Sequence, residues 1–263
     1  MNRITVLITG ASEGLGKSLA LECAKRKMNL ALISLPDTGL AALGNYLRLN
    51  FGVEVFCLEL DLTNEEAAEL VFVGLKDAGI TVNALINNAG IGNWSWFEDK
   101  SPAFYRTQID LNITNTVLLT QLFLKYKPLH QASYILNVGS LGGHFIVPKK
   151  QVYGATKSFV SYFTRCLQLE LTHTDVKVSL LSPGGINTKP ELLVMNSQLK
   201  GFAAATINEA DFVAREAVSG MLSGKKEIVP GFANRFLLLL DGLLPSFIKN
   251  IIIKRNLMHI LEV

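Results

Sequence analysis

The sequence has few cysteines and no long apolar run, and each absence excludes a class of protein. Its three cysteines, Cys23, Cys57 and Cys166, are too few and too scattered along 263 residues for a disulfide framework or a CxxC metal site. No apolar run approaches the ~18 residues that a helix needs to cross a bilayer. We therefore expect reduced thiols, no metal centre and no transmembrane helix.

Charge is also sparse. Charged residues make up 18% of the chain and the net charge is +3, without a dense Lys/Arg block, so nucleic acid is not an expected partner. Apolar residues make up 49%, enough for a sizeable core. The chain begins on a strand pattern at residues 4–8 rather than on a signal-peptide layout, which predicts a cytoplasmic protein.

Short apolar, β-branched runs alternate with longer helical patterns along almost the whole chain. Strands that are apolar on both faces are typical of a sheet covered by helices on each side. The pattern predicts a single α/β domain over residues 1–263, built on a doubly wound parallel sheet of about seven strands with helices on both faces. The predicted strands are residues 4–8, 29–35, 53–59, 82–86, 133–139, 176–182 and 226–230.

Two helix starts can be read directly. Thr63-Asn64-Glu65-Glu66 fits a capping box, in which the first and last side chains bond each other's backbone amides. Ser101-Pro102 places a capping hydroxyl before a proline at the first helical position.

The first strand is followed by a glycine-rich turn, Thr9-Gly10-Ala11-Ser12-Glu13-Gly14-Leu15-Gly16-Lys17-Ser18. Glycines there let backbone approach a phosphate, and the next helix aims its N-terminal amides at the negative charge. One interpretation is a Walker A loop, except that Ala11 stands where its first glycine belongs. The other is a dinucleotide turn with glycines at 10, 14 and 16.

Polar and small residues follow the later strands at the edge where open α/β folds bind ligands. Asn112 lies inside a predicted helix, where asparagine is unfavourable unless it is exposed or used. The polar and small residues that follow strands are Asp61-Leu62, Asn87-Asn88-Ala89-Gly90, Ser140 and the loop from Ser182 to Thr188.

Tyr153 and Lys157 lie four positions apart, so on a helix they share one face. A fixed ammonium stabilises a phenolate and lowers the pKa of the phenol. We therefore expect Tyr153 to have a lowered pKa and to serve as a general acid or base.

Taken in order, TGASEGLG at 9–16, Asp61-Leu62, NNAG at 87–90, Asn112, Ser140, Tyr153 with Lys157, and Pro183-Gly184 resemble the short-chain dehydrogenase/reductase family over nearly the whole chain. The resemblance implies a Rossmann-fold enzyme that moves a hydride between nicotinamide and a carbonyl or alcohol. It also favours the dinucleotide turn over the Walker A loop.

The resemblance implies a role for each motif residue. Tyr153 would exchange the proton with the substrate oxygen, Lys157 would lower the Tyr153 pKa and hold the nicotinamide ribose, and Ser140 would bind the substrate oxygen. Asn112 would hold a water in a proton relay. The remaining residues implied to contact cofactor are Gly10, Ser12, Glu13, Gly14, Leu15, Gly16, Ser34, Asp61, Leu62, Asn88, Ala89, Gly90, Pro183, Gly184, Ile186 and Thr188.

The cofactor is implied to be NADP or NAD, and the residues that usually decide between them depart from the family pattern. Leu35 stands where an acid would bind the ribose diol of NAD, and Pro36 where an arginine often meets the 2′-phosphate of NADP. Ser34 and Thr38 can donate to a phosphate, but Asp37 would repel one. We expect a slight preference for NADP.

The apolar lid predicted over residues 188–208, with Trp94, Trp96 and Phe97, favours an apolar carbonyl substrate. The resemblance also implies a homodimer or homotetramer formed through the helices of Asn112 and Tyr153. Apolar residues on the second helix fit such an interface: Phe159, Tyr162, Phe163, Leu167 and Leu171. A monomer mass by light scattering at micromolar concentration would contradict this expectation.

An apolar segment over residues 232–263 extends past the last strand, with Gly242 and Pro245 dividing it into short helical pieces. It is expected either to pack on the protein or to touch a membrane peripherally. The alternative function is a non-catalytic dinucleotide-binding sensor or scaffold. That alternative is disfavoured because the Tyr, Lys and Ser that such proteins usually lose are all present.

Overall fold

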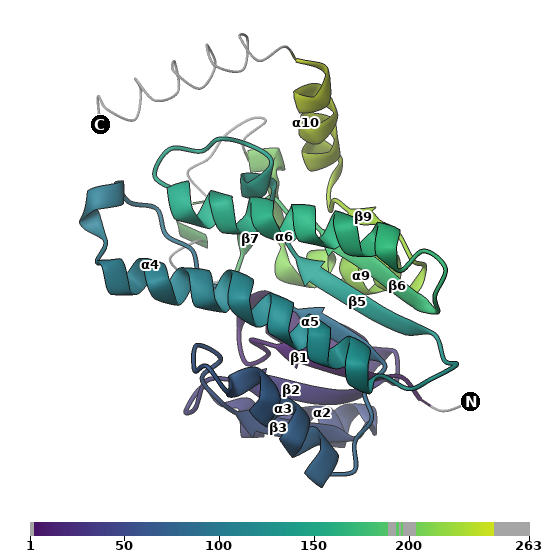
Figure 1. Ribbon diagram of the computed structural model, residues 1–263. Helices are drawn as coiled ribbons and strands as arrows, with labels where there is room; N and C mark the ends of the chain where they lie inside the picture. The colour runs from purple at the N-terminus through teal and green to yellow at the C-terminus, as the bar shows by residue number, and fades with distance from the viewer. Residues whose placement is uncertain (1–2, 189–192, 195, 197–203, 245–263) are drawn as a thin grey trace.

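The computed structural model describes residues 3–188, 193–194, 196 and 204–244, and its centre is a parallel sheet (Figure 1). The seven strands of this sheet lie in the order β3-β2-β1-β4-β5-β6-β9, and all neighbouring pairs run parallel. They are β1 (Thr5–Thr9), β2 (Asn29–Ser34), β3 (Val55–Glu59), β4 (Ala84–Asn87), β5 (Ser133–Val138), β6 (Val176–Leu181) and β9 (Glu227–Ile228). The predicted strands are confirmed, and their ends differ from the observed ones by at most two residues.

Helices cover both faces of this sheet. On one face lie α1 (Gly14–Lys25), α2 (Leu40–Phe51) and α9 (Ala210–Leu222), and their apolar residues form one core cluster. On the other lie α3 (Ala67–Asp77), α5 (Asn115–Tyr126) and α6 (Gln151–Glu170), which share a second cluster. Figure 1 shows α5 and α6 crossing this second face.

Alternation along each strand explains why both faces are apolar. Successive side chains of a strand point to opposite faces. In β1, Val6 and Ile8 belong to the first cluster while Leu7 belongs to the second. All three side chains are fully buried. A strand that is covered on both faces therefore has apolar residues at successive positions rather than alternating apolar and polar ones.

The chain reverses its direction of travel across the sheet between β1 and β4. It first builds outward through β2 to β3, then returns to β4 on the other side of β1 and continues to β9. Ligands of open α/β folds bind beyond the carboxyl ends of the strands at such a switch point. The loops after β1, β4, β5 and β6 all meet there.

A long helical stretch in three parts supports this edge. Ser101 caps α4 (Pro102–Ile109) by accepting a hydrogen bond from the Phe104 amide at 3.2 Å, as predicted. A π-helical segment, η2 (Asp110–Thr114), then leads into α5. Asn112 lies in that segment, and π-helical turns of this kind are frequent at functional sites.

The capping box predicted at residues 63–66 is wrong. Helix α3 begins at Ala67, and Glu66 makes no side-chain cap hydrogen bond. Thr63 instead donates its amide (2.9 Å) and its hydroxyl (2.8 Å) to Asp61 Oδ1. The nearby carboxylate competes successfully for the groups that the box would have used.

A second sheet of two short strands was not predicted. β7 (Gly185–Asn187) pairs with β8 (Ile207–Glu209) in parallel. The end of the predicted 188–208 lid is therefore strand, while residues 189–192, 195 and 197–203 of that prediction lie outside the described residues.

The apolar residues of α6 divide between core and surface. Leu167 is buried, and Phe163 and Leu171 pack against the second cluster, so these three serve the protein's own core. Phe159 and Tyr162 are 41% and 75% exposed. The predicted interface surface on α6 is thus smaller than the sequence pattern indicated.

Helix α10 (Phe232–Leu243) is the described part of the apolar C-terminal segment. Asn234 anchors it by donating to the carbonyls of Pro230 (2.9 Å) and Thr206 (3.2 Å). Residues 245–263 of the predicted segment lie outside the described residues. Among the helices that the structure describes, none has the length and apolarity to cross a membrane.

Candidate active site

Tyr153 and Lys157 occupy the first two turns of α6, as the spacing predicts. Lys157 is 5% exposed, and its Nζ donates to the carbonyl of Val138 at the end of β5 at 2.7 Å. The same Nζ lies 5.9 Å from the centre of the Tyr153 ring. One buried ammonium therefore holds α6 against the edge of the sheet and stands beside the phenol.

The prediction that Tyr153 has a lowered pKa is wrong. Burial raises the pKa of Tyr153, and a hydrogen bond with Ser140 offsets only part of that rise. Burial also lowers the pKa of Lys157 from 10.5 to about 8. Removing both groups from water disfavours both charged forms, and this desolvation is the main cause of both pKa shifts.

Ser140 follows β5 and caps the short turn η3 (Leu141–Gly143), accepting a hydrogen bond from the Gly142 amide at 3.0 Å. The turn packs on α6, where the Ser158 hydroxyl donates to the Gly143 carbonyl at 2.5 Å. This packing places the Ser140 hydroxyl beside Tyr153.

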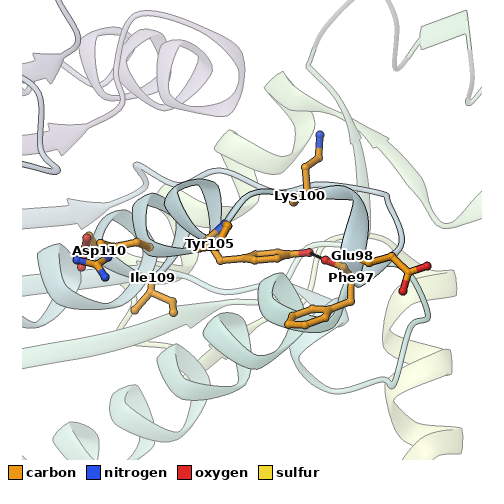
Figure 2. Close-up of a pocket in the computed structure, with 8 residues that line it drawn as sticks. Phe97, Glu98, Lys100, Tyr105, Ile109 and Asp110 are labelled. Atoms are coloured by element: carbon orange, nitrogen blue, oxygen red, sulfur yellow. Dashed lines mark hydrogen bonds between the residues drawn. The ribbon is translucent and has the colours of Figure 1, made fainter.

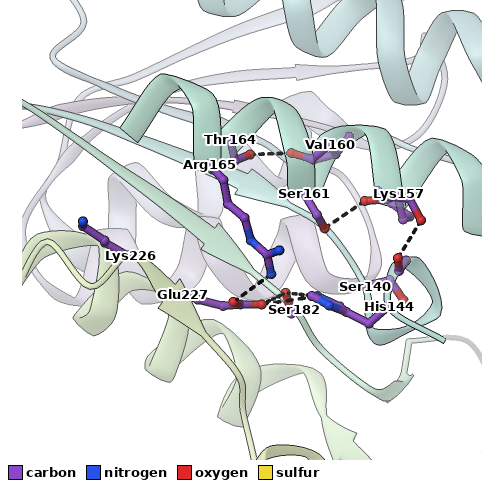
Figure 3. Close-up of polar contacts among 12 residues, drawn as sticks. Ser140, His144, Lys157, Val160, Ser161, Thr164, Arg165, Ser182, Lys226 and Glu227 are labelled. Atoms are coloured by element: carbon purple, nitrogen blue, oxygen red, sulfur yellow. Dashed lines mark hydrogen bonds and ion pairs between the residues drawn. The ribbon is translucent and has the colours of Figure 1, made fainter. Parts of the chain in front are cut away.

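A polar network behind η3 steadies this arrangement (Figure 3). His144 lies 3.3 Å from Glu227 Oε1, and the Ser182 hydroxyl donates to the same oxygen at 2.9 Å. The other carboxylate oxygen lies 3.3 Å from Arg165 of α6. The hydrogen bond with His144 is the largest cause that holds the Glu227 pKa at about 2, well below its usual range.

Asn112 is buried and fully engaged with protein. Its Oδ1 accepts from the Ile91 amide at 2.9 Å, while Nδ2 donates to the Ile91 carbonyl and the Thr156 hydroxyl, each at 3.0 Å. A Cβ added to Gly90 would lie 2.9 Å from Asn112 Oδ1 and 3.5 Å from Lys157 Nζ. Asn112, Gly90 and Lys157 therefore lie together, although Gly90 was expected on the adenosine side. The relay through a water stays a prediction.

The glycine-rich turn has the shape needed to receive a phosphate. Gly10 and Gly14 have φ of +64° and +52°, which side chains disfavour. A Cβ on Gly16 would overlap the backbone of Gly10. No side chain caps the first turn of α1, so its amides remain directed at the loop. Leu15 packs in the core, which leaves only its backbone for a ligand.

Three hydroxyls gather where β2 ends beside this turn. The Ser12 and Ser34 hydroxyls lie 2.6 Å apart, and Thr38 donates to Ser34 at 3.2 Å. Leu35 is 51% exposed at the position where an acid was expected. At the edge of the predicted ribose site, the groups that can donate hydrogen bonds are thus these three uncharged hydroxyls.

The remaining predicted cofactor residues surround the same crevice. Asn88 donates to the Thr9 carbonyl at 2.9 Å, and a Cβ on Gly10 would lie 3.0 Å from Ala89 Cα. Thr188 lies across the turn, 3.2 Å from where a Gly14 Cβ would stand. Ile186 lies in β7, and Pro183 accepts from the Leu141 amide at 2.9 Å.

Some predicted contacts are already occupied by protein. The Asp61 carboxylate accepts from Thr63, the Leu62 carbonyl accepts from Asn115, and Gly184 lies against Asn234. Glu13 is exposed at the rim.

Four residues of the site escaped the sequence analysis. Gly92 and Gly142 flank the Tyr153 ring, since their added Cβ atoms would lie 3.0 and 3.6 Å from it. Thr156 joins Asn112 to the Tyr153 carbonyl, to which it donates at 2.8 Å. Lys150 lies 5.5 Å from the Tyr153 ring centre. Only Thr156 carried a signal, because it lies inside the Tyr-Gly-Ala-Thr-Lys motif.

A separate surface hollow lies over α4 (Figure 2). Phe97 and Tyr105 stack at its base with ring centres 5.1 Å apart, and the Tyr105 hydroxyl donates to the Phe97 carbonyl at 2.7 Å. None of the predicted site residues lines it. Within the described part of the chain, no group of three His, Cys, Asp or Glu side chains is placed to hold a metal ion.

Comparisons with known proteins identify a family that this chain resembles. A family model described as short chain dehydrogenase matches residues 4–194. The chain is 33% identical over 187 residues to the very-long-chain 3-oxoacyl-CoA reductase of Macaca fascicularis, an alignment that covers 70% of this chain and 59% of that protein. It is 34% identical over 185 residues to 17-beta-hydroxysteroid dehydrogenase type 3 of Homo sapiens, covering 69% and 59%.

Among solved structures, a short-chain dehydrogenase from Sphingobium yanoikuyae in complex with NADPH superposes with a TM-score of 0.78 at 29% identity, over 91% of this chain and 93% of that chain. The protein therefore belongs to the short-chain dehydrogenase family, and the predicted family and fold class are confirmed. The alignments span only 59% of the length of these two curated relatives.

We predict that Lys157 makes stability depend on pH. Because its pKa falls from 10.5 to about 8 on folding, the unfolded chain binds more protons between those values, and stability rises with pH across that window. The free energy of unfolding should rise relative to that of a Lys157→Met variant by up to about 3 kcal/mol. Urea denaturation near pH 7 and pH 10 measures this difference. Lys76→Met, at an exposed position, is the control, and an equal change in all three proteins would contradict the prediction.

Proposed function

We propose that this protein is an NADPH-preferring oxidoreductase that interconverts a carbonyl and an alcohol on a largely apolar substrate. One observation supports this most directly. Ser140, Tyr153 and Lys157 lie together, in a chain whose glycine-rich turn has backbone geometry suited to binding a phosphate. The solved relative from Sphingobium yanoikuyae binds NADPH, and the two curated relatives are named for oxoacyl-CoA and hydroxysteroid chemistry.

The chain's own groups handle the proton and position the reacting oxygen. A bound nicotinamide dinucleotide supplies the hydride for reduction or accepts it in oxidation. During reduction the Tyr153 hydroxyl donates its proton to the carbonyl oxygen, while the Ser140 hydroxyl donates a hydrogen bond to that oxygen as negative charge develops. Lys157 then stabilises the phenolate that remains, and a proton from solvent restores the phenol.

The Tyr153 pKa is raised, and burial is the main cause. A phenol with a raised pKa stays protonated at neutral pH and therefore carries the proton that reduction requires. Lys157, with a pKa of about 8, still carries its charge at neutral pH and can stabilise the phenolate once it forms.

The residues present fit a dinucleotide. The positive φ of Gly10 and Gly14, the close packing of Gly16 and the uncapped first turn of α1 suit a pyrophosphate. Ser12, Ser34 and Thr38 would hold the adenosine ribose, and Lys157 the nicotinamide ribose.

The alternative, a non-catalytic sensor or scaffold, has less support. Such a protein needs no buried lysine, and burying Lys157 costs stability below its pKa. A role in proton transfer with Tyr153 and Ser140 would explain why the protein buries Lys157 despite this cost in stability.

We predict that Tyr153→Phe lowers turnover by at least ~10²-fold, because it removes only the proton donor. Cofactor affinity should remain nearly unchanged, since the ring and its packing against Gly92 are kept. NADPH oxidation followed by absorbance with a panel of ketones, aldehydes and quinones measures the first, and nicotinamide fluorescence the second. Wild-type activity in the Tyr153→Phe protein would refute the mechanism.

We also predict that NADPH binds more tightly than NADH. Neutral hydroxyls at residues 12, 34 and 38 can donate to a 2′-phosphate, and no acid occupies position 35 to bind a diol. Introducing a carboxylate by Ser34→Asp should reverse the order through repulsion of the phosphate. Fluorescence titration with both cofactors decides this, and NADH binding about tenfold tighter to the wild type, ~1.4 kcal/mol, would count against it.

Assembly and location are the remaining parts of the proposal. A dimer or tetramer through the helices of Asn112 and Tyr153 is supported by the exposure of Phe159 and Tyr162, and light scattering measures its mass. A cytoplasmic location, with peripheral membrane contact, stays a proposal, and cell fractionation tests it.

The membrane contact is supported by the exposed face of α10. Phe232, Phe236, Leu239 and Leu243 are 82%, 41%, 62% and 72% exposed and recur at helical spacing. Such a stripe suits the headgroup boundary of a bilayer, from which an apolar carbonyl compound could be taken.

Replacing Leu239 and Leu243 with Ser should abolish co-sedimentation with anionic vesicles while leaving the fold intact. Truncation at Gly231 is a poorer test, because it removes Asn234 and its bonds to the site loops. Leu49→Ser, at an 86% exposed position on α2, is the matched control. Equal sedimentation of all three proteins, or none by the wild type, would refute the contact.

A further inference from the structure

Lys150 lies beside Tyr153, and no charged residue in the described part of the chain pairs with it. It precedes the first turn of α6, and its Nζ lies 5.0 Å from the centre of the Trp94 ring and 5.5 Å from that of Tyr153. Among the residues that the structure describes, no ion pair or hydrogen bond involves this Nζ. A partly buried ammonium ordinarily has an anionic or carbonyl partner, so a bound ligand is a candidate partner for Lys150.

Lys150 and Lys157 differ in their hydrogen-bond partners. Both ammonium groups lie at nearly the same distance from the Tyr153 ring. Lys157 donates one of its N–H groups to the Val138 carbonyl, whereas the contacts of Lys150 Nζ with described residues are with the faces of aromatic rings. A lysine has three donors, and an aromatic face attracts its charge without satisfying them. The Lys150 side chain is thus held between two rings, and no described residue accepts a hydrogen bond from its Nζ.

The loop that brings Trp94 to Lys150 is firmly built. Gln108 donates to the Ile91 carbonyl at 3.1 Å and to Asn93 Oδ1 at 3.2 Å, and the Ser95 amide donates to the Lys149 carbonyl at 3.1 Å. These bonds tie the loop after β4 to the segment before α6. The position of Lys150 is therefore set by the fold rather than by a chance surface contact.

We propose that Lys150 binds a carboxylate carried by the carbonyl substrate, so that the substrate class is an oxo acid with an apolar remainder. The inference rests on the proposed function, because it takes Tyr153 to mark the reacting carbonyl. An anion paired with Lys150 lies beside the same ring that presents the Tyr153 hydroxyl. Because Lys150 Nζ lies 5.5 Å from the centre of that ring, we infer a short carbon chain between the carboxylate and the carbonyl. Burial, which lowers the Lys150 pKa, also means that an arriving carboxylate meets little competing water.

Paired substrates test the proposal in the full chain. Levulinate is an oxo acid, and its methyl ester keeps the ketone but removes the charge. With NADPH present, Lys150→Gln should raise KM for levulinate at least about tenfold, through loss of a charge-assisted hydrogen bond, and change KM for the ester less than about twofold. Lys150→Arg should restore most of the affinity for levulinate.

Lys149→Gln is the matched control. Lys149 is also stacked on a tryptophan, with its Nζ 4.6 Å from the Trp96 ring centre, and it makes no described side-chain contact with Tyr153. This variant should leave both KM values unchanged. Equal loss on both substrates in Lys150→Gln would show that Lys150 acts on Tyr153 rather than on a carboxylate, and would overturn the proposal. No change on either substrate would overturn it as well.

A binding measurement separates this inference from the proposed function. The chain has two tryptophans, and both lie in this loop, so its tryptophan emission reports on this site alone. Levulinate should change that emission saturably in the wild type but not in Lys150→Gln, and the methyl ester should not compete. Reduction of neutral ketones without a levulinate response would overturn the carboxylate site alone. A levulinate response without reduction of any carbonyl would overturn the proposed function and retain the site.

Discussion

The hydrogen bond from the buried Lys157 ammonium to the Val138 carbonyl connects the two halves of the candidate site. It joins the helix that carries Tyr153 to the end of the strand that leads to Ser140. A buried cation needs such a partner, because leaving water is costly for a charge. The same bond directs the ammonium toward the sheet edge, where Gly90 and Asn112 also converge. Replacing Lys157 therefore changes both the chemistry of the site and the packing beneath it.

Around this bond the protein uses glycine where side chains would obstruct the site. Gly92 and Gly142 let backbone approach the two sides of the Tyr153 ring, and Gly90 lets it approach Asn112. Each close approach limits how far the ring can move. The phenol is thus oriented by packing, which is the condition for a single positioned proton donor to be effective.

Polar groups behind the site extend this positioning to the far edge of the sheet. Glu227 of the last strand bonds Ser182, meets His144 after the Ser140 turn and pairs with Arg165 on α6. The carboxylate therefore connects four segments that are distant in sequence. Its low pKa means that it remains charged, and the network intact, throughout the neutral range.

The sequence by itself determined the fold class and the positions of the strands along the chain, because these depend on apolar periodicity. Motif spacing predicted the candidate catalytic residues, and the structure places Ser140, Tyr153 and Lys157 together. Local rules also placed the Ser101 cap, but they failed at Thr63, where the Asp61 carboxylate captured the groups assigned to a capping box. Only the tertiary structure decided the rest. The lowered pKa expected of Tyr153 became a raised one, since desolvation depends on burial that no spacing reports. Likewise Lys150, unremarkable along the chain, became a candidate ligand for a carboxylate only when the fold placed Trp94 and Tyr153 against it.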